Sequence, residues 1–312
     1  MNESNALPTD LARRGLIVAG AAALASSLGS TAQAQTAPAA TTPPGPTPPQ
    51  AKPGRVAVEK RGAILLIGID RVDARNRFDA PIIIGLGKAY HQLDHDDELR
   101  VGVLYGLGPD FSLGLDVPAF VAAQTTGILP VKDTDYIDPL GRRAPFRTKP
   151  VVAAVQGGVW YGGHELFLAA DIRVAANDAV FNQGEVMRGA FPGGGATVRF
   201  TREAGWGNAM RYMLTGDTWG AEEAHRMGLV QDITPPGKQL DRAIELAQKV
   251  AAAAPIGVRA TLASAHQSLV GEETALAELQ PTFAAIFKTE DLKEARRAAQ
   301  EGRAPVFQGS RT

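Results

Sequence analysis

A glutamate that directly follows a glycine-rich turn carries the first chemical signal in this sequence. Glu165 comes after Gly162 and Gly163, and a run of small and β-branched residues, 151–155, precedes the turn. The run predicts a strand buried on both faces, and the pattern from Gly163 onward predicts a helix with Glu165 in its first turn. Glycines let backbone N–H groups approach a ligand, and a helix N-terminus favours negative charge. The stretch therefore predicts an oxyanion site beside a carboxylate; the alternative is a glutamate that serves only the helix dipole.

The composition narrows the class of protein. The 312 residues are 45% hydrophobic and 21% charged, which is typical of a globular chain with a sizeable core. A formal net charge of -1 provides no overall field for attracting nucleic acid or an anionic membrane. The sequence contains no cysteine, which excludes disulfides, thiolate catalysis and cysteine-ligated zinc.

The N-terminus has the features of an export signal. Arg13 and Arg14 precede an apolar segment, residues 16–28, that is too short to span a bilayer, and a small-residue cleavage site ends at Ala34. Residues 1–34 therefore predict a twin-arginine signal peptide, cut after Ala34. The alternative is a short helix of the fold, which the absence of a polar second face disfavours. Residues 35–54 are rich in proline and predict a disordered linker.

The rest of the chain predicts an α/β core, residues 55–254, and a helical C-terminal region, residues 255–312. Strands are expected at residues 56–58, 63–69, 101–105, 151–155, 172–175, 179–181 and 229–233. Helices are expected at 79–93, from 163, from 196, at 206–214 and 221–227, and in every periodic segment after residue 240. The polar stretch 125–148 is long for a connection, and such loops are often lids or binding loops.

Several stretches, taken together and in order, resemble the enoyl-CoA hydratase/isomerase (crotonase) superfamily. Residues 111–116, FSLGLD, resemble the family's F-x-x-G-x-D loop, and residues 149–155, KPVVAAV, resemble its K-P-V-I-A-A-V strand. Residues 162–166, GGHEL, resemble G-G-x-E-L, and residues 192–195, PGGG, resemble P-G-x-G. The resemblance continues through the segment 214–230 and the tail 289–307. It implies a spiral of ββα units followed by a C-terminal helical region that forms trimers.

The resemblance also implies a site and a chemistry. Family members bind acyl-CoA thioesters with the carbonyl oxygen between two backbone N–H groups, which by motif position are those of Leu115 and Gly162. Hydratases use two glutamates, here Glu165 and Glu185, to add water across a double bond. Paired carboxylates suit this reaction because one deprotonates the water while the other protonates the α-carbon. Further substrate-binding positions follow from the same motifs: Phe111, Gly114, Asp116, Trp160, Tyr161, Gly163, Pro192 and Gly193.

The sequence departs from the family pattern at two places. The family often follows F-x-x-G-x-D with a lysine that reaches the CoA phosphates, whereas Val117 and Pro118 stand here. The phosphate contact is expected from basic residues elsewhere, with these candidates: Arg71, Arg75, Arg77, Lys288 and Lys293. Trp160 and Tyr161 replace small residues, which predicts either an aromatic-lined acyl pocket or core packing. His164 neighbours Glu165 but should point elsewhere, because adjacent helical residues diverge by about 100°.

The leading hypothesis is an enoyl-CoA hydratase that needs no metal and no cofactor besides the coenzyme A of its substrate. The alternatives are an isomerase or a thioester hydrolase on the same fold, or a non-catalytic binding protein. Apolar residues at near-helical spacing in the tail predict a homotrimer or dimer of trimers: Leu262, Leu269, Leu276, Phe283 and Phe287. The signal predicts a periplasmic location, although CoA thioesters belong to the cytoplasm, where the protein would stay if the signal is not used.

Overall fold

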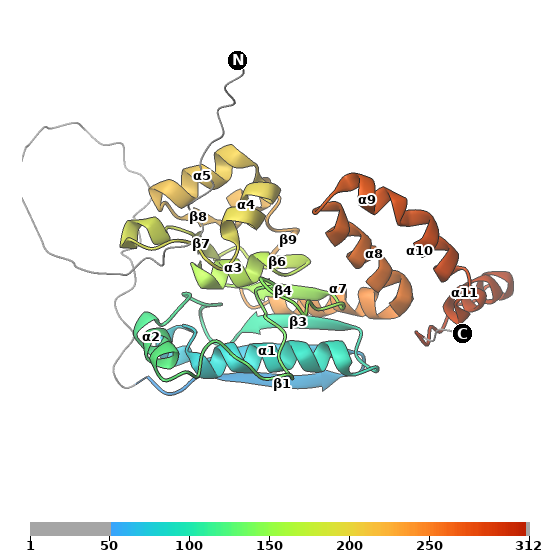
Figure 1. The fold of residues 1–312 in the computed structure, drawn as a ribbon, viewed down its shortest axis with the longest axis horizontal. Coiled ribbons are helices and arrows are strands. Elements are labelled where there is room, and N and C mark those ends of the chain that lie inside the picture. The colour runs from blue at the N-terminus through green and yellow to red at the C-terminus, as the bar shows by residue number, and fades with distance from the viewer. Residues whose placement is uncertain (1–50, 310–312) are drawn as a thin grey trace, which may run out of the picture. The chain divides into compact units, whose positions relative to one another are not determined.

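A large mixed sheet forms the centre of the fold (Figure 1). The computed structural model describes residues 51–309, so the predicted export signal and most of the predicted linker lie outside the described residues. The sheet has the order β1-β2-β3-β4-β6-β9, and all neighbouring pairs are parallel except β1 and β2. Its strands are β1 Arg55–Arg61, β2 Ile64–Asp70, β3 Val101–Gly106, β4 Val151–Val155, β6 Ile172–Ala176 and β9 Asp232–Thr234.

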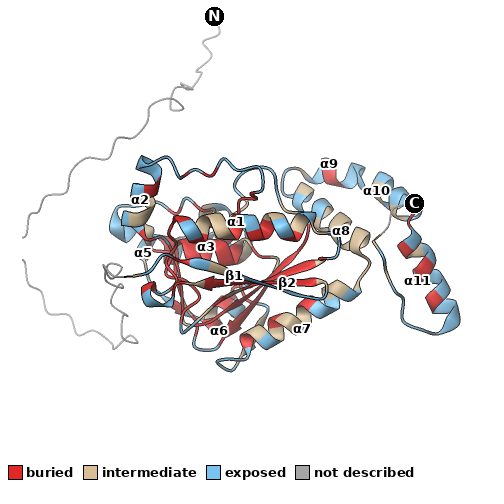
Figure 2. Cartoon of the chain, turned by 90° about the horizontal axis from the view of Figure 1, so that it is seen from below, coloured by how far each residue is buried: buried red, intermediate tan, exposed pale blue. Residues whose placement is uncertain are grey.

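The two faces of this sheet bury different residues of the same strand. In β4, Val151, Ala153 and Val155 belong to the larger core, together with residues of α1 (Ala80–His95). Val152 and Ala154 belong to a second core that includes residues of α7 (Gln239–Ala252). Successive side chains of a strand point to opposite faces, so β4 is buried on both, as its sequence predicts. Figure 2 shows α1 and α7 on opposite sides of the sheet.

A second sheet lies beside α3 (Gly162–Leu168), and of its three strands only β7 was predicted, as residues 179–181. It consists of β5 (Gly158–Trp160), β7 (Val180–Asn182) and β8 (Trp219–Gly220). The glycine-rich turn expected between the strand at 151–155 and Glu165 is not a single turn, because β5 lies within it and pairs in parallel with β7. On its other side β5 bonds to Ser112, whose amide donates to the Gly158 carbonyl at 3.0 Å. Because β7 and Ser112 are distant from β5 along the chain, the local sequence around β5 does not indicate this pairing.

Helices make up the remainder of the described residues. The helix α2 (Val117–Thr125) is another element that was not predicted, although the Asp116 side chain caps its N-terminus and Pro118 lies in its first turn. The core is completed by the turns η1 Val72–Ala74 and η2 Glu185–Arg188 and the helices α3 Gly162–Leu168, α4 Ala196–Ala204, α5 Trp206–Thr215 and α6 Ala221–Arg226. The C-terminal region is helical, as predicted: α8 Pro255–Ser268, α9 Glu272–Ala277, α10 Leu279–Ile286 and α11 Glu290–Glu301.

The C-terminal helices extend away from the sheet (Figure 1). Within residues 51–309, no helix has both the length and the apolar character needed to cross a bilayer. The fold thus places α3, the loop before α2 and the loop before α4 next to one another at the second sheet, and these three segments build the site.

Candidate active site

The backbone of the loop before α2 presents one free amide. Phe78 pairs with Leu115: the Phe78 amide donates to the Gly114 carbonyl at 2.7 Å, and the Asp116 amide donates to the Phe78 carbonyl at 3.0 Å. Alternate backbone groups of an extended segment point to opposite sides, so the Leu115 N–H points away from Phe78. Within residues 51–309 that N–H donates no hydrogen bond. It is therefore available to a ligand.

The start of α3 presents a second free amide beside the first. A Cβ atom placed on Gly162 would lie 3.8 Å from the Leu115 nitrogen, so the two backbones are neighbours. The preceding residue, Tyr161, has φ 54° and ψ -123°, which is unusual for a residue with a side chain. Its own amide donates to the Asn182 carbonyl at 2.9 Å, whereas the Gly162 amide has no acceptor in the described part of the chain. Leu115 and Gly162 thus form the pair of donors that an oxyanion hole requires.

Two glycines make this approach possible. At Gly114, where φ is +79°, a Cβ atom would lie 2.8 Å from the Tyr161 Cβ and 3.0 Å from the Gly162 nitrogen. At Gly163 a Cβ atom would lie 2.5 Å from the Ser112 carbonyl oxygen. Because real Cβ atoms do not approach so closely, any larger residue at these positions would push the two donor segments apart.

Glu165 lies under the loop that leads into α4. Its side chain is buried, and Oε1 accepts hydrogen bonds from the Gly194 amide at 2.6 Å and the Ala196 amide at 3.2 Å. Burial raises the pKa of Glu165, while the bonds from Ala196 and Gly194 act in the opposite direction because they favour the ionised form. A Cβ atom on Gly194 would meet the Glu165 carboxylate at 2.4 Å, so the P-G-x-G segment is a cradle for this carboxylate.

Glu185 has a different environment, in η2. Its Oε1 accepts a hydrogen bond from Gln183 Nε2 at 2.7 Å, and its Oε2 is buried without a hydrogen-bond partner among residues 51–309. Burial raises the pKa of Glu185 to about 7, and the nearby Glu165 charge adds to the increase. Two adjacent carboxyl groups with different environments can hold one proton between them near neutral pH, which is the requirement for paired acid–base chemistry.

Comparison with known proteins identifies the family. A family model described as "Enoyl-CoA hydratase/isomerase" matches residues 59–310. The chain belongs to the enoyl-CoA hydratase/isomerase family. It is 35% identical over 258 residues to enoyl-CoA hydratase EchA19 of Mycobacterium tuberculosis, covering 80% of this chain and 95% of that protein. It is 32% identical over 255 residues to the short-chain-enoyl-CoA hydratase of Clostridium acetobutylicum, covering 80% of this chain and 95% of that protein.

Solved structures agree with this assignment. The crystal structure of a probable enoyl-CoA hydratase/isomerase from Mycobacterium abscessus is 41% identical, with a TM-score of 0.79, and covers 82% of this chain and 98% of that chain. An enoyl-CoA hydratase from Mycobacterium tuberculosis H37Rv is 38% identical, with a TM-score of 0.76 and coverage of 82% and 99%. The crotonase fold expected from the sequence motifs is confirmed.

Three of the predicted substrate-binding residues have side chains that are occupied elsewhere. Phe111 is fully buried in the larger core. Asp116 accepts a hydrogen bond from Arg71 at 2.8 Å and one from the Ala119 amide at 3.4 Å. Trp160 is buried and donates from its indole nitrogen to the Val180 carbonyl at 3.1 Å. These contacts hold the motif loops in place.

The remaining predicted positions lie at the edge of the site. Tyr161 is half-buried, and the Arg188 guanidinium lies 4.7 Å from the centre of its ring. In the loop before α4, Pro192 is buried and Gly193 is exposed. The sequence did not single out Arg188, although its position three residues after Glu185 places it on the same turn, η2.

The candidate phosphate-binding residues differ in their availability. Arg71 is buried between Asp79 and Asp116, and Arg75 donates to both carboxylate oxygens of Asp110. Lys293 pairs with Glu290, and Lys288 is exposed. Arg77 is buried, and this burial, together with the nearby Arg188 charge, lowers the pKa of Arg77. Arg71 is thus a structural residue, and the half-exposed Arg75 is bound through two hydrogen bonds to the buried Asp110.

The stretch predicted as a lid or binding loop, residues 125–148, reaches the segment around Glu165. Arg199 of α4 donates to the Leu140 carbonyl at 2.6 Å and so ties the loop to the segment that holds Glu165. Arg142, paired with Asp138 at 3.0 Å, faces Glu165 and acts to lower its pKa. The loop therefore contributes positive charge near the Glu165 carboxylate.

Proposed function

We propose that this protein adds water across the α,β double bond of an enoyl-CoA thioester. The observation that carries the proposal is the buried Glu165 and the half-buried Glu185, whose Oε2 is buried, beside the two free amides of Leu115 and Gly162. The thioester carbonyl oxygen accepts a hydrogen bond from each of the two amides. These hydrogen bonds stabilise the enolate that forms when water attacks the β-carbon. One such donor contributes about 3 kcal/mol in comparable sites.

The environments of the two glutamates assign their roles. Glu165 accepts two backbone N–H bonds, which favour the ionised form, so it acts as the base that deprotonates the attacking water. Glu185 has an unpaired buried oxygen and a pKa of about 7, so it retains a proton that it delivers to the α-carbon. The product is a 3-hydroxyacyl-CoA, and proton exchange with water restores both carboxyl groups.

The alternatives within the family differ in the number of carboxylates that they require. An isomerase moves one proton between two carbons, and a hydrolase directs water to the carbonyl carbon, so each depends unequally on the two glutamates. Incubation with enoyl-CoA esters of different chain length, followed by the loss of the conjugated enoyl absorbance, tests hydration directly. Parallel assays for double-bond migration and for free thiol release would support an isomerase or a hydrolase if hydration were absent. A protein that binds the esters without any turnover would be the non-catalytic alternative.

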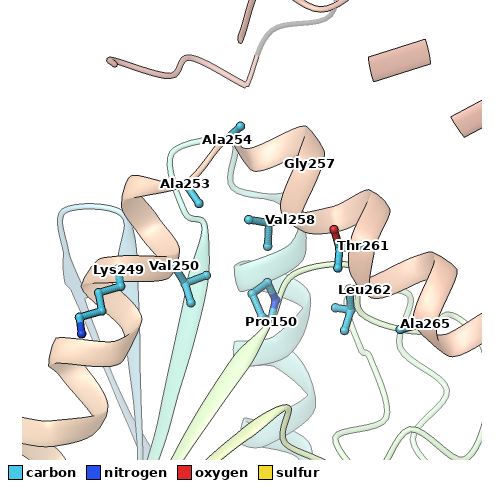
Figure 3. Close-up of a pocket in the computed structure, with 10 residues that line it drawn as sticks. All are labelled: Pro150, Lys249, Val250, Ala253, Ala254, Gly257, Val258, Thr261, Leu262 and Ala265. Atoms are coloured by element: carbon cyan, nitrogen blue, oxygen red, sulfur yellow. The ribbon is translucent and has the colours of Figure 1, made fainter. Parts of the chain in front are cut away.

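We further propose that the mature protein self-associates as a homotrimer or a dimer of trimers. The C-terminal helices expose four of the predicted apolar residues by 46–58% of their surface: Leu269, Leu276, Phe283 and Phe287. A groove of about 660 Å³ between α7 and α8 is lined by apolar side chains around Pro150 (Figure 3), and a second of about 840 Å³ follows α8, α9 and α10. Neither groove includes Glu165 or Glu185, and a second copy of the chain is the occupant that the exposed helices favour.

We also propose that residues 1–34 direct export and that cleavage after Ala34 releases the mature chain. The support is the order of Arg13 and Arg14, an apolar segment and a small-residue cleavage site. Export of an already folded oligomer is compatible with a twin-arginine signal. In that case the enoyl thioester would have to be present outside the cytoplasm.

A further inference from the structure

A fully buried histidine lies next to Glu165 in the sequence but reaches a different part of the site. The His164 ring is surrounded by the rings of Phe167, Phe181, Phe200 and Trp219, with centroid separations of 5.2–5.9 Å. Its Nδ1 bonds to Gln183 Oε1, and its Nε2 has no hydrogen-bond partner among the described residues. Burial lowers the pKa of His164 to about 3, so the ring is neutral throughout the neutral pH range.

The bonds between His164, Gln183 and Glu185 have a defined direction. The Gln183 Nε2–H donates to Glu185 Oε1, an oxygen that can accept in both protonation states when the proton is on Oε2, and the Gln183 oxygen therefore faces His164. His164 must then donate from Nδ1, which fixes the tautomer of the neutral ring. An apolar side chain would fill the aromatic cage equally well, so this donated bond is the contact that distinguishes histidine at position 164.

We propose that His164 is a positioning residue which, through Gln183, fixes the oxygen of Glu185 that carries the transferable proton. With the Gln183 N–H held on Oε1, protonation occurs on Oε2, the oxygen without a partner. If the amide turned over, its oxygen would instead accept the Glu185 proton and withhold it from the substrate. The short helix α3 therefore supplies Glu165 directly and orients Glu185 indirectly. This inference rests on the roles proposed above for the two glutamates.

Charged groups near Glu185 and near His164 influence the pKa values of these two residues without involving the Gln183 amide. Glu185 is faced by Glu165 of α3 and by Arg188 of its own turn, and the Tyr161 hydroxyl is also near. His164 is faced by Arg173 of β6. Within residues 51–309, none of these groups forms a side-chain hydrogen bond with Glu185, whereas Gln183 does. Loss of the amide orientation should therefore affect the proton on Glu185 selectively.

The sign of the effect follows from the bond that is lost. The Gln183 N–H favours ionised Glu185, so its removal raises the pKa of Glu185 further above its ordinary value. Because Glu185 acts as the acid, kcat/KM falls as pH rises through its pKa. We expect His164→Leu and Gln183→Met to move this high-pH limb upward by about one pH unit, the usual worth of a hydrogen bond to a charged group. KM and the low-pH limb, which reports Glu165, should remain near the wild-type values.

Two variants control for a purely structural effect. In His164→Asn the side-chain amide can occupy the place of Nδ1 and donate to Gln183, so the high-pH limb should return toward that of the wild type. Gln156→Met removes another buried glutamine amide, which donates to Gly106 and Gly108 rather than to Glu185. It should lower the melting temperature without moving the limb.

Infrared titration provides a readout that does not depend on turnover. The carbonyl stretch of protonated Glu185, assigned by its loss in Glu185→Gln, should persist to higher pH in His164→Leu and Gln183→Met. If His164→Leu does not fold, Gln183→Met decides the question. The inference is overturned if folded Gln183→Met retains the wild-type titration of Glu185, or if His164→Leu folds and does so. A wild-type protein without hydration activity would overturn the proposed function instead, and the titration would still test the positioning.

Discussion

Replacing Glu165 by glutamine isolates its chemical role from its structural one. The glutamine oxygen can still accept hydrogen bonds from the amides of Gly194 and Ala196, which donate to the wild-type Oε1 at 2.6 and 3.2 Å. The remaining oxygen becomes an NH₂ group of nearly the same size, which cannot remove a proton from water. We therefore expect Glu165→Gln to fold and to bind substrate normally, with the loss confined to the chemical step.

The magnitude follows from the role of a positioned base. Loss of such a group lowers kcat by about 10²–10⁴, which corresponds to about 3–5 kcal/mol in the activation barrier. Glu185→Gln should cause a loss in the same range, because hydration needs the base and the acid in one step. The double variant should be only slightly slower than either single variant, since the removal of one group already disables the pair.

The assay is the initial rate of loss of enoyl-CoA absorbance at saturating substrate, with KM measured in parallel. Glu59→Gln, which changes an exposed glutamate of β1, is the matched control and should retain full activity. Glu165→Ala should also be less stable than Glu165→Gln by about 1–3 kcal/mol, because the alanine leaves two buried amides without an acceptor. The reasoning would be refuted if either glutamine variant kept more than a third of the wild-type kcat, or if the two losses multiplied in the double variant.

Four further predictions concern the pH profile, the oxyanion hole, the assembly and export. The high-pH limb of kcat/KM should lie near pH 7, where Glu185 loses its proton, and a pH–rate profile that stays flat to pH 9 would contradict the acid role. Gly114→Ala should lower kcat by about 10²–10³, because its Cβ would separate the two oxyanion donors; an active, normally folded variant would argue against that geometry. Sedimentation should show a trimer or hexamer that Phe283→Lys weakens, whereas a monomer at micromolar concentration would exclude the proposed assembly. Exported protein should begin at Gln35, and processing that survives replacement of both signal arginines by lysine would count against the twin-arginine route.

Local sequence patterns were sufficient for the elements that carry the first glutamate. The apolar run of β4 predicts a strand buried on both faces, and α3 begins at the glycine pair, as its pattern indicates. The helical C-terminal region follows from the same reasoning, because helical periodicity is a property of neighbouring residues. The helix α2 also had local signals, a capping Asp116 and Pro118 in its first turn, which the sequence interpretation did not use.

The relations within the site were decided by the tertiary structure. Glu165 takes its hydrogen bonds from amides 29 and 31 residues away, and β5 takes its partners from β7 and from Ser112. The motif resemblance indicated which residues belong together, but not that Asp116 and Trp160 are occupied by structural contacts.

The two hydrogen bonds that link His164, Gln183 and Glu185 show most clearly what the sequence determines and what only the tertiary structure determines. The sequence determined that His164 and Glu165 diverge on one helix, because adjacent helical residues point in different directions. It could not determine that Gln183, 19 positions later, would receive the histidine and orient the second glutamate. Hydrogen-bond direction and burial depend on which side chains the packed fold brings within about 3 Å of one another, and that is set only when the segments pack together.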